Sequence, residues 1–307
     1  MEAVLKKELG CSSVKSYGAS GGGCISAGQG YVVDGKAVFV KTNDKEGARI
    51  MFDGEAASLE VILNTQTVKV PKPIKVFDCQ EVGSALVMEY FDMRALRKFM
   101  GTLGTQMARL HLYNSEQGKL LSKSDSSVHK PETVNYVDQF GFHIPTCCGF
   151  IPQDNTWEKD WVASINMQKL QQQLDLIEQT YHDRETQSLW SEAQLKITKL
   201  FDGLNIVPAL LHGDLWSGNA AEIDDRPVIF DAASFYGHNE FDLAIAMMFG
   251  GFGQDFFQSY HKLIPKAPGF DQRNQLYQLF HYLNHWNHFG TGYRSQSIAL
   301  LKKLAKL

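Results

Sequence analysis

The sequence has no apolar run long enough to cross a membrane. Its longest apolar stretch, Leu243 to Phe252, is short and includes two glycines, whereas a membrane-spanning helix needs about 20 predominantly apolar residues. The first residues, MEAVLKKELG, mix acidic and basic side chains and lack the apolar core of an export signal. We therefore expect a cytoplasmic protein with no membrane partner.

An excess of basic residues is also missing. Lys and Arg number 30 against 34 Asp and Glu, which leaves a net charge of −4. Such a balance offers no basic surface for the phosphate backbone of DNA or RNA. No nucleic-acid partner is expected.

Cysteine is scarce and has no metal-binding spacing. The five cysteines are Cys11, Cys24, Cys79, Cys147 and Cys148. No two of them form a CxxC pair, and an odd, scattered set fits a reducing compartment better than a disulfide framework. A small disulfide-stabilised fold and a zinc knuckle are thereby excluded.

The chain of 307 residues is long enough for two lobes that share a cleft. Residues 1–92 are β-rich: YVVDGKAVFVK predicts a hairpin that turns at Asp34-Gly35, and ALVMEY predicts a buried strand. Residues 93–307 are mainly helical by the spacing of their apolar residues. One polar segment within them, residues 115–135, is expected to be a surface loop.

A glycine-dense segment, GASGGGCISAG, lies between two predicted strands at residues 18–28. Backbone N–H groups without a neighbouring Cβ can close over phosphate oxygens, so Gly22, Gly23 and Cys24 are candidate nucleotide contacts. A plain turn is the alternative. The Cys24 side chain is either a small filler or a redox-sensitive thiol, whose oxidation, for example to Cys24 of a second subunit, would stop turnover. The chain is then a monomer or a redox-dependent homodimer.

A lysine and a glutamate follow in an order that suits phosphate binding. Lys41 lies at the end of the predicted strand VFVK, and Glu55 lies on the apolar face of a helix predicted from about Glu46 to Leu63. A carboxylate on an apolar helix face is expected to form an ion pair with a cationic side chain. Paired with Glu55, the Lys41 ammonium would be held in place while it contacts phosphates.

The strongest chemical signal is LLHGDLWSGN, which follows an apolar run. Asp214 would accept the proton of an attacking hydroxyl, and Asn219, five residues later, would coordinate Mg²⁺ from the same loop. Asp231, at the end of PVIFD, is placed to meet the same metal. The alternative is that Asp214 and Asn219 only cap a turn.

The order of these features indicates a kinase-like phosphotransferase that uses ATP and Mg²⁺. It differs from a protein kinase, because Asp242 in FDLAIA follows Asp231 too closely for a peptide-docking segment, and His212 is followed by Gly213 instead of Arg. The acceptor is therefore a small hydroxyl compound or a small group displayed on a protein. A non-catalytic nucleotide-binding scaffold is disfavoured, because no member of the catalytic set is missing.

Several dispersed segments resemble the fructosamine-3-kinase family over nearly the whole chain. They are SGGGCISAG, VFVK, VPKPIKV, VMEY, LLHGDLWSGN, FDAASFYGH, IPKAPGF and LYQLFHYLNHWNHFG. The resemblance implies an α+β, two-lobed protein-kinase-like fold of the aminoglycoside phosphotransferase type, with a β-rich N-lobe at 1–92 and a helical C-lobe at 93–307. An aminoglycoside or choline-like acceptor is the alternative within this fold.

The resemblance also implies an activity and a set of roles. The activity is ATP- and Mg²⁺-dependent phosphorylation of the 3-hydroxyl of ketosamines on glycated proteins or small molecules, which leads to deglycation. Ribulosamines and psicosamines are expected acceptors, and fructosamines are left open. The implied roles are Asp214 as base, Asn219 and Asp231 as metal ligands, Lys41 with Glu55 at the phosphates, Glu89, Tyr90 and Phe91 at adenine through their backbone, and Asp242 beneath the catalytic loop.

Two further positions are candidates at the acceptor site. Trp216 is a candidate platform for the sugar, with simple packing as the alternative. His281, His285 and His288 recur on one predicted helix, which suggests a zinc face or, more in keeping with the aromatic neighbours, a polar pocket or core; we place His288 near the substrate. Ala232 stands where the family pattern has a proline after the metal-binding Asp, a change that removes no ligand.

Overall fold

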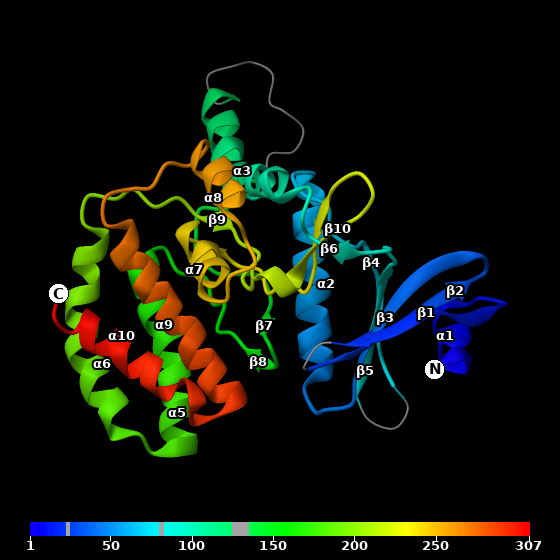
Figure 1. Cartoon of the computed structure of the whole chain (residues 1–307), viewed down its shortest axis with the longest axis horizontal. Coiled ribbons are helices and arrows are strands. Elements are labelled where there is room, and N and C mark those ends of the chain that lie inside the picture. Colours follow the sequence, from blue (N-terminus) through cyan, green and yellow to red (C-terminus); the bar gives the residue numbers. More distant parts are fainter. Residues whose placement is uncertain (23–24, 80–82, 125–134) are drawn as a thin grey trace.

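The computed structural model describes residues 1–307 apart from 23–24, 80–82 and 125–134; at 19–22 and 124 only the backbone is described. Figure 1 shows a sheet at one end of the molecule, helices at the other, and α2 between them. Within the described residues, no helix is both long and apolar enough to cross a lipid bilayer.

The amino-terminal part is a five-stranded antiparallel sheet in the order β1-β2-β3-β5-β4. Its strands are β1 (Val14–Gly22), β2 (Ala27–Val33), β3 (Lys36–Asn43), β4 (Pro73–Asp78) and β5 (Ser84–Glu89). The predicted hairpin is confirmed: Asp34 and Gly35, with φ of 44° and 83°, form the two-residue turn between β2 and β3. The strand predicted from ALVMEY is β5.

The sheet is covered on both faces, and the alternation of side chains along its strands decides which helix each residue meets. The short helix α1 (Glu2–Leu9) contributes Leu5 to a small core with Val40 and Val87. On the other face, α2 (Ala48–Thr65) packs Phe52 and Leu59 into the main core, together with Leu86 and Met88 of β5. Apart from a two-residue shift, α2 is the helix predicted at Glu46–Leu63.

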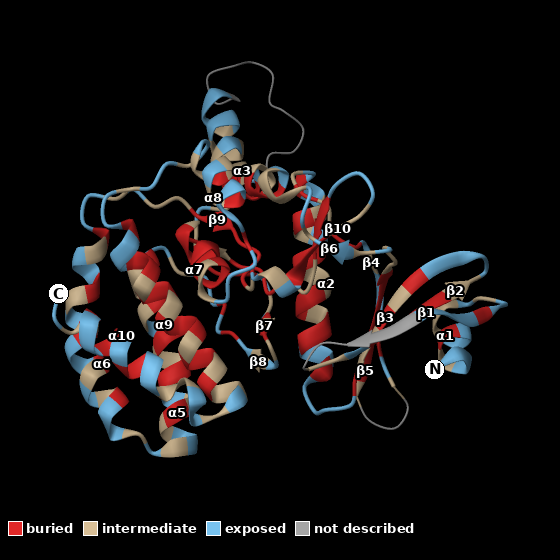
Figure 2. Cartoon of the chain, viewed as in Figure 1, coloured by how far each residue is buried: buried red, intermediate tan, exposed pale blue. Residues whose placement is uncertain are grey.

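The remaining chain is mainly helical. Its helices are α3 (Met100–Ser124), α4 (Trp161–Ala163), α5 (Gln172–Tyr181), α6 (Arg184–Ile197), α7 (Glu240–Met248), α8 (Gln254–His261), α9 (Phe270–Phe289) and α10 (Arg294–Leu304). A π-helix, η1 (Ser164–Gln171), joins α4 to α5, and the 3₁₀ turns are η2 (Thr198–Phe201), η3 (Ser217–Asn219) and η4 (Thr291–Tyr293). Figure 2 shows α7 largely buried at the centre of this part, whereas α6 and α10 expose one face.

Short strands build the loops that carry the site. They are β6 (Arg94–Ala95), β7 (Cys147–Cys148), β8 (Ile151–Pro152), β9 (Ala209–Leu210), β10 (Ala220–Glu222), β11 (Pro227–Ile229) and β12 (Tyr236–Gly237). Three of them form a sheet in the order β11-β10-β6, and β12 pairs with β9. These strand pairings hold residues 209–237 together as one compact unit.

One expectation was wrong. Residues 115–124, predicted as part of a surface loop, continue α3, while 125–134 lie outside the described residues. The segment is polar, but Glu116, Gln117, Lys119 and Leu120 are good helix formers. Once the buried first turns of α3 have nucleated the helix, such residues extend it without needing an apolar face.

Candidate active site

Asp214 lies in the segment that follows β9. A buried carboxylate, that of Asp242, holds the backbone of this segment in place. The two carboxylate oxygens of Asp242, on α7, accept hydrogen bonds from His212 N at 2.7 Å and Gly213 N at 2.8 Å. His111 Nε2 lies 3.0 Å from the same carboxylate. Burial alone would raise the pKa of Asp242, but the hydrogen bonds from His111 and from the His212 backbone hold it below its usual value.

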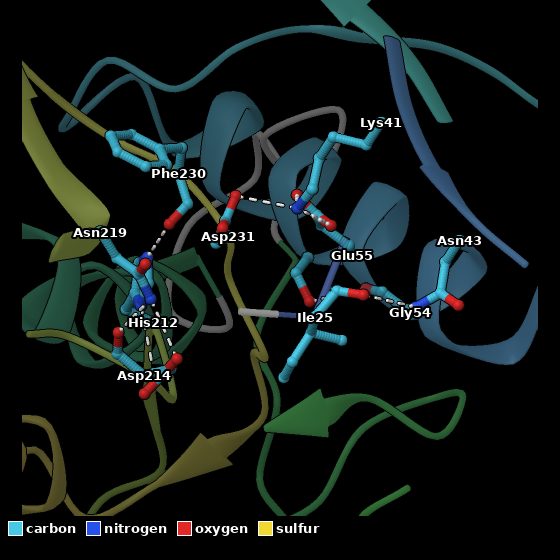
Figure 3. Close-up of polar contacts among 11 residues, drawn as sticks. Ile25, Lys41, Asn43, Gly54, Glu55, His212, Asp214, Asn219, Phe230 and Asp231 are labelled. Atoms are coloured by element: carbon cyan, nitrogen blue, oxygen red, sulfur yellow. Dashed lines mark hydrogen bonds and ion pairs between the residues drawn. The ribbon is translucent and has the colours of Figure 1, made fainter. Parts of the chain in front are cut away.

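Asp214 and Asn219 contact each other directly. Asn219 Nδ2 donates to the backbone oxygen and to Oδ2 of Asp214, both at 2.9 Å, as Figure 3 shows. Burial raises the pKa of Asp214 to about 7, while the Asn219 hydrogen bond acts in the opposite direction. The amide nitrogen of Asn219 is used in this contact, so its amide oxygen is the atom left for a cation.

Lys41 joins the sheet to α2 and to the loop after β11. Its Nζ lies 2.6 Å from Glu55 Oε2 and 2.9 Å from Asp231 Oδ1 (Figure 3). Burial would lower the pKa of Lys41, but the charges of Asp231 and Glu55 outweigh it and raise that pKa, so the ammonium stays charged. The Asp231 side chain itself is 40% exposed and remains accessible from the cleft.

The turn that carries Asp231 is tied to the segment around Asp214. Asp231 has φ of 57°, a conformation that non-glycine residues adopt only when their surroundings impose it. The surroundings do so here, because Phe230 O accepts from His212 Nε2 at 3.0 Å and Ala233 N donates to His212 O at 2.8 Å. Ala232, in place of the expected proline, is buried within this turn.

These residues line a cavity of about 630 Å³ between the sheet and the helices. Glu89, Tyr90 and Phe91 lie along one part of its wall, together with apolar residues such as Phe39 and Met88. The remaining wall includes Cys147, Cys148, Trp216, Asn284, His285, His288 and Phe289. Lys41, Glu55, Asp214, Asn219 and Asp231 also contribute to the lining. The structure therefore brings the residues predicted from separate segments into one cleft.

The glycine-rich segment is described only in part. Gly22 ends β1, whereas Gly23 and Cys24 lie outside the described residues, so their predicted nucleotide contacts and the redox prediction for Cys24 stay predictions. Residues that follow them, Ile25 to Gly28, do line the cavity.

The three histidines of α9 have different surroundings. His281 is fully buried, and burial lowers its pKa to about 3, whereas His285 and His288 line the cavity. His288 Nδ1 lies 2.7 Å from Asn284 O, and its Nε2 accepts from Phe150 N at 2.9 Å. Among the described residues, no group of three His, Cys, Asp or Glu side chains could hold a metal ion, so nothing favours the zinc alternative. Trp216 is 39% exposed at the cavity wall and is not a packed core residue.

Three side chains near Asp214 were not predicted from the sequence. His111 supports Asp242, and Asn284 Nδ2 contacts Cys148. Burial and the charge of Asp214 raise the pKa of the Cys148 thiol. Their positions in the sequence carry no recognisable spacing relative to Asp214. Only the closeness of Asn284 to His288 in LNHWNHFG could have drawn attention to it.

The chain is similar over its whole length to one protein family and to several named proteins. The fructosamine kinase family profile matches residues 1–306. The chain is 58% identical over 309 residues to the ketosamine-3-kinase of Mus musculus, with 100% of both chains covered. It is 38% identical over 304 residues to a chloroplastic protein-ribulosamine 3-kinase of Oryza sativa subsp. indica, covering 98% of this chain and 80% of that one.

Solved structures agree on the fold. A Thermobifida fusca protein assigned as a fructosamine-3-kinase superposes with a TM-score of 0.78 at 24% identity, covering 100% of this chain and 99% of that chain. A thermostable mutant of the aminoglycoside phosphotransferase APH(4)-Ia, in a ternary complex with AMP-PNP and hygromycin B, gives a TM-score of 0.61 at 14% identity, covering 100% of this chain and 98% of that chain. The fold is thus the two-lobed α+β, protein-kinase-like fold that the sequence resemblance implied.

Proposed function

The chain belongs to the fructosamine kinase family, and we propose that it transfers the terminal phosphate of ATP to the 3-hydroxyl of ketosamines. The expected acceptors are ribulosamines and psicosamines on proteins or small molecules, with fructosamines as a further candidate. The observation that carries this proposal is the single cleft in which Asp214 meets Asn219 while Lys41 meets Asp231. A carboxylate, an amide and an ammonium in one cavity are the groups that phosphoryl transfer requires.

ATP is proposed to lie with its adenine against the backbone of Glu89, Tyr90 and Phe91. The apolar residues of that part of the wall suit a flat aromatic ring. Lys41, held by Glu55, would then contact the phosphates, and the backbone of Gly22, Gly23 and Cys24 would cover them. In this arrangement residues 1–92 form the nucleotide-binding lobe and residues 93–307 the lobe that carries the catalytic loop and the acceptor.

Asp214 is proposed to take the proton of the acceptor hydroxyl. A buried carboxylate whose pKa is raised toward 7 is a stronger base than a solvated one, which favours this transfer. Trp216 would provide an aromatic surface for the sugar, and His288, fixed by Phe150 N, would lie beside it. The phosphorylated adduct is expected to be unstable and to leave a free lysine, which would make the protein a deglycating repair enzyme of the cytoplasm.

The residues present fit Mg²⁺. A carboxylate oxygen of Asp231 and the free amide oxygen of Asn219 are the hard ligands that this ion prefers, and both residues line the cavity. When bound, the ion would neutralise charge on the phosphates. The protein's own part is to orient these two oxygens: the His212 contacts fix the turn that carries Asp231, and the hydrogen bonds to Asp214 fix the Asn219 amide.

The proposal is tested by phosphate transfer from labelled ATP to a ribulosamine and a fructosamine, side by side. Choline and an aminoglycoside serve as control acceptors. Asp214→Ala should lower the rate of transfer at least about 100-fold, while binding of ATP stays close to that of the wild type, because the base acts in the chemical step. Transfer to choline alone, or full activity in Asp214→Ala, would contradict the proposal.

A further inference from the structure

Asn284, on α9, lines the cavity one helical turn before His288, the residue proposed to lie beside the sugar, and has no role in the proposed function. The residue is only 4% exposed, and it lines the same cavity as Asp214 and His288. Its Nδ2 donates to the backbone oxygen and to Sγ of Cys148, both at 3.3 Å. Among the described residues, the amide is therefore hydrogen-bonded through its nitrogen only.

These contacts fix which way the amide points. The Cys148 carbonyl can only accept a hydrogen bond, so the nitrogen of the amide must face it and the oxygen must face away. Asn284 Oδ1 is buried and, within the described part of the chain, has no hydrogen-bond partner. A buried acceptor without a partner is costly, and native proteins rarely leave one unless a ligand or water satisfies it.

The thiol between Asn284 and Asp214 indicates which group of a ligand could bind this oxygen. The Cys148 thiol, which accepts from Asn284 Nδ2, also lies next to Asp214, whose charge adds to burial in raising the pKa of the thiol. Asn284 and Asp214 are thus separated by one thiol group on the same wall of the cavity. Neighbouring hydroxyls of one sugar can reach two groups so placed.

We propose that Asn284 Oδ1 accepts a hydrogen bond from the acceptor hydroxyl next to the one that Asp214 deprotonates. On the open-chain form of a ketosamine, in which C2 is a carbonyl, this is the 4-hydroxyl, so Asn284 is a substrate-binding residue that selects acceptors carrying a donor at that position. The inference rests on the proposed function, because it takes the 3-hydroxyl as the site of phosphorylation. A site built around such a hydrogen bond rejects the analogue that lacks the hydroxyl.

The test combines an enzyme variant with a substrate variant. A ribulosamine and its 4-deoxy analogue are compared as acceptors for the wild type, Asn284→Ala and Asn274→Ala. Asn274 is the matched control, because it is a buried asparagine of the same helix that does not line the cavity; its Oδ1 accepts from Gln278 Nε2 at 2.8 Å.

The wild type and Asn274→Ala should show a KM for the deoxy analogue roughly tenfold above that for the ribulosamine, the effect of one neutral hydrogen bond. Asn284→Ala should raise the KM for the ribulosamine by a similar factor and lose the discrimination, with the KM for ATP unchanged. A merely structural role would raise the KM values for both acceptors and for ATP together.

Two results would overturn the inference. One is a wild type that does not discriminate between the two acceptors, a comparison that needs no variant to fold. The other is an Asn284→Ala protein that discriminates as the wild type does, as expected if a water molecule satisfies Oδ1. Failure of the proposed function would look different, because the wild type would then phosphorylate neither acceptor.

Discussion

Lys41 Nζ lies 2.9 Å from Asp231 Oδ1, although 190 residues separate them in the chain. Lys41 comes from β3 of the large sheet, and Asp231 follows β11 in the helical part. The contact therefore exists only when both parts of the protein are folded and correctly placed. Glu55, on α2 between them, holds the same ammonium at 2.6 Å and is itself buried.

Replacing Lys41 alone should be costly in two ways. Lys41→Met leaves the buried Glu55 carboxylate without its partner, which is expected to destabilise the protein by about 3 kcal/mol. Adding Glu55→Leu should recover much of that stability, because no unpaired buried carboxylate remains and Asp231 is partly exposed to solvent, while phosphate transfer stays low in both variants. Urea unfolding and kcat measured on the two variants check this. Equal stability of the single and double variants would contradict the role assigned to the pair.

Asn219 should control how much Mg²⁺ the enzyme needs. Asn219→Ala removes an oxygen ligand, so the Mg²⁺ concentration for half-maximal activity is expected to rise at least about tenfold, and chelation of the metal should abolish transfer in the wild type. Asn205→Ala, at an exposed asparagine before β9, is the control and should leave the titration unchanged. An unshifted Mg²⁺ titration in Asn219→Ala would rule Asn219 out as a ligand.

A methyl group at Gly213 should displace the segment that carries Asp214. Gly213 has φ of 84°, and an added Cβ would lie 2.1 Å from Ala233 O. Gly203 has a similar φ of 73°, but nothing lies within 4 Å of its added Cβ. Gly203→Ala should therefore cost only about 1 kcal/mol of backbone strain, whereas Gly213→Ala should cost more and lower kcat at least about tenfold. Thermal unfolding and kcat of the two variants decide it, and equal effects would show that the contact with Ala233 is unimportant.

Lys169 should make stability depend on pH. Its Nζ is buried, donates to Asn155 Oδ1 at 2.6 Å and lies 4.2 Å from the centre of the Phe235 ring. Burial lowers its pKa to about 7, with the charge of Asp154 opposing, whereas an unfolded lysine has a pKa of about 10.4. Between these two pKa values, the lysine of the unfolded chain is protonated to a greater extent than that of the folded protein. The cost of burying the ammonium is therefore complete below about pH 7 and is relieved as the pH rises.

The matched comparison is with Lys169→Met, which lacks the titrating group. From pH 7 to pH 9 the free energy of unfolding of the wild type should increase by about 2 kcal/mol relative to Lys169→Met. Urea unfolding of both proteins at the two pH values measures the difference. If it does not change with pH, Lys169 stays charged in the folded protein throughout.

Local pattern was sufficient for the parts of the fold that depend on neighbouring residues. The hairpin at Asp34-Gly35 follows from a turn that needs two positive φ angles, and the burial of Phe52 and Leu59 follows from helical spacing along α2. The same reasoning was wrong for residues 115–124, because a polar composition does not reveal that a helix nucleated upstream can continue.

The sequence by itself determined which catalytic groups are present. Asp214 and Asn219 are five residues apart, so their contact is local, and the order of the motifs indicates a kinase. Tertiary structure alone decided which side chains from distant segments become partners. His111 meets Asp242 across 131 residues, and Cys148 meets Asn284 across 136. The physical reason is that periodicity reports which side of an element faces the core, whereas the packing of distant elements sets which side chains share one buried polar contact.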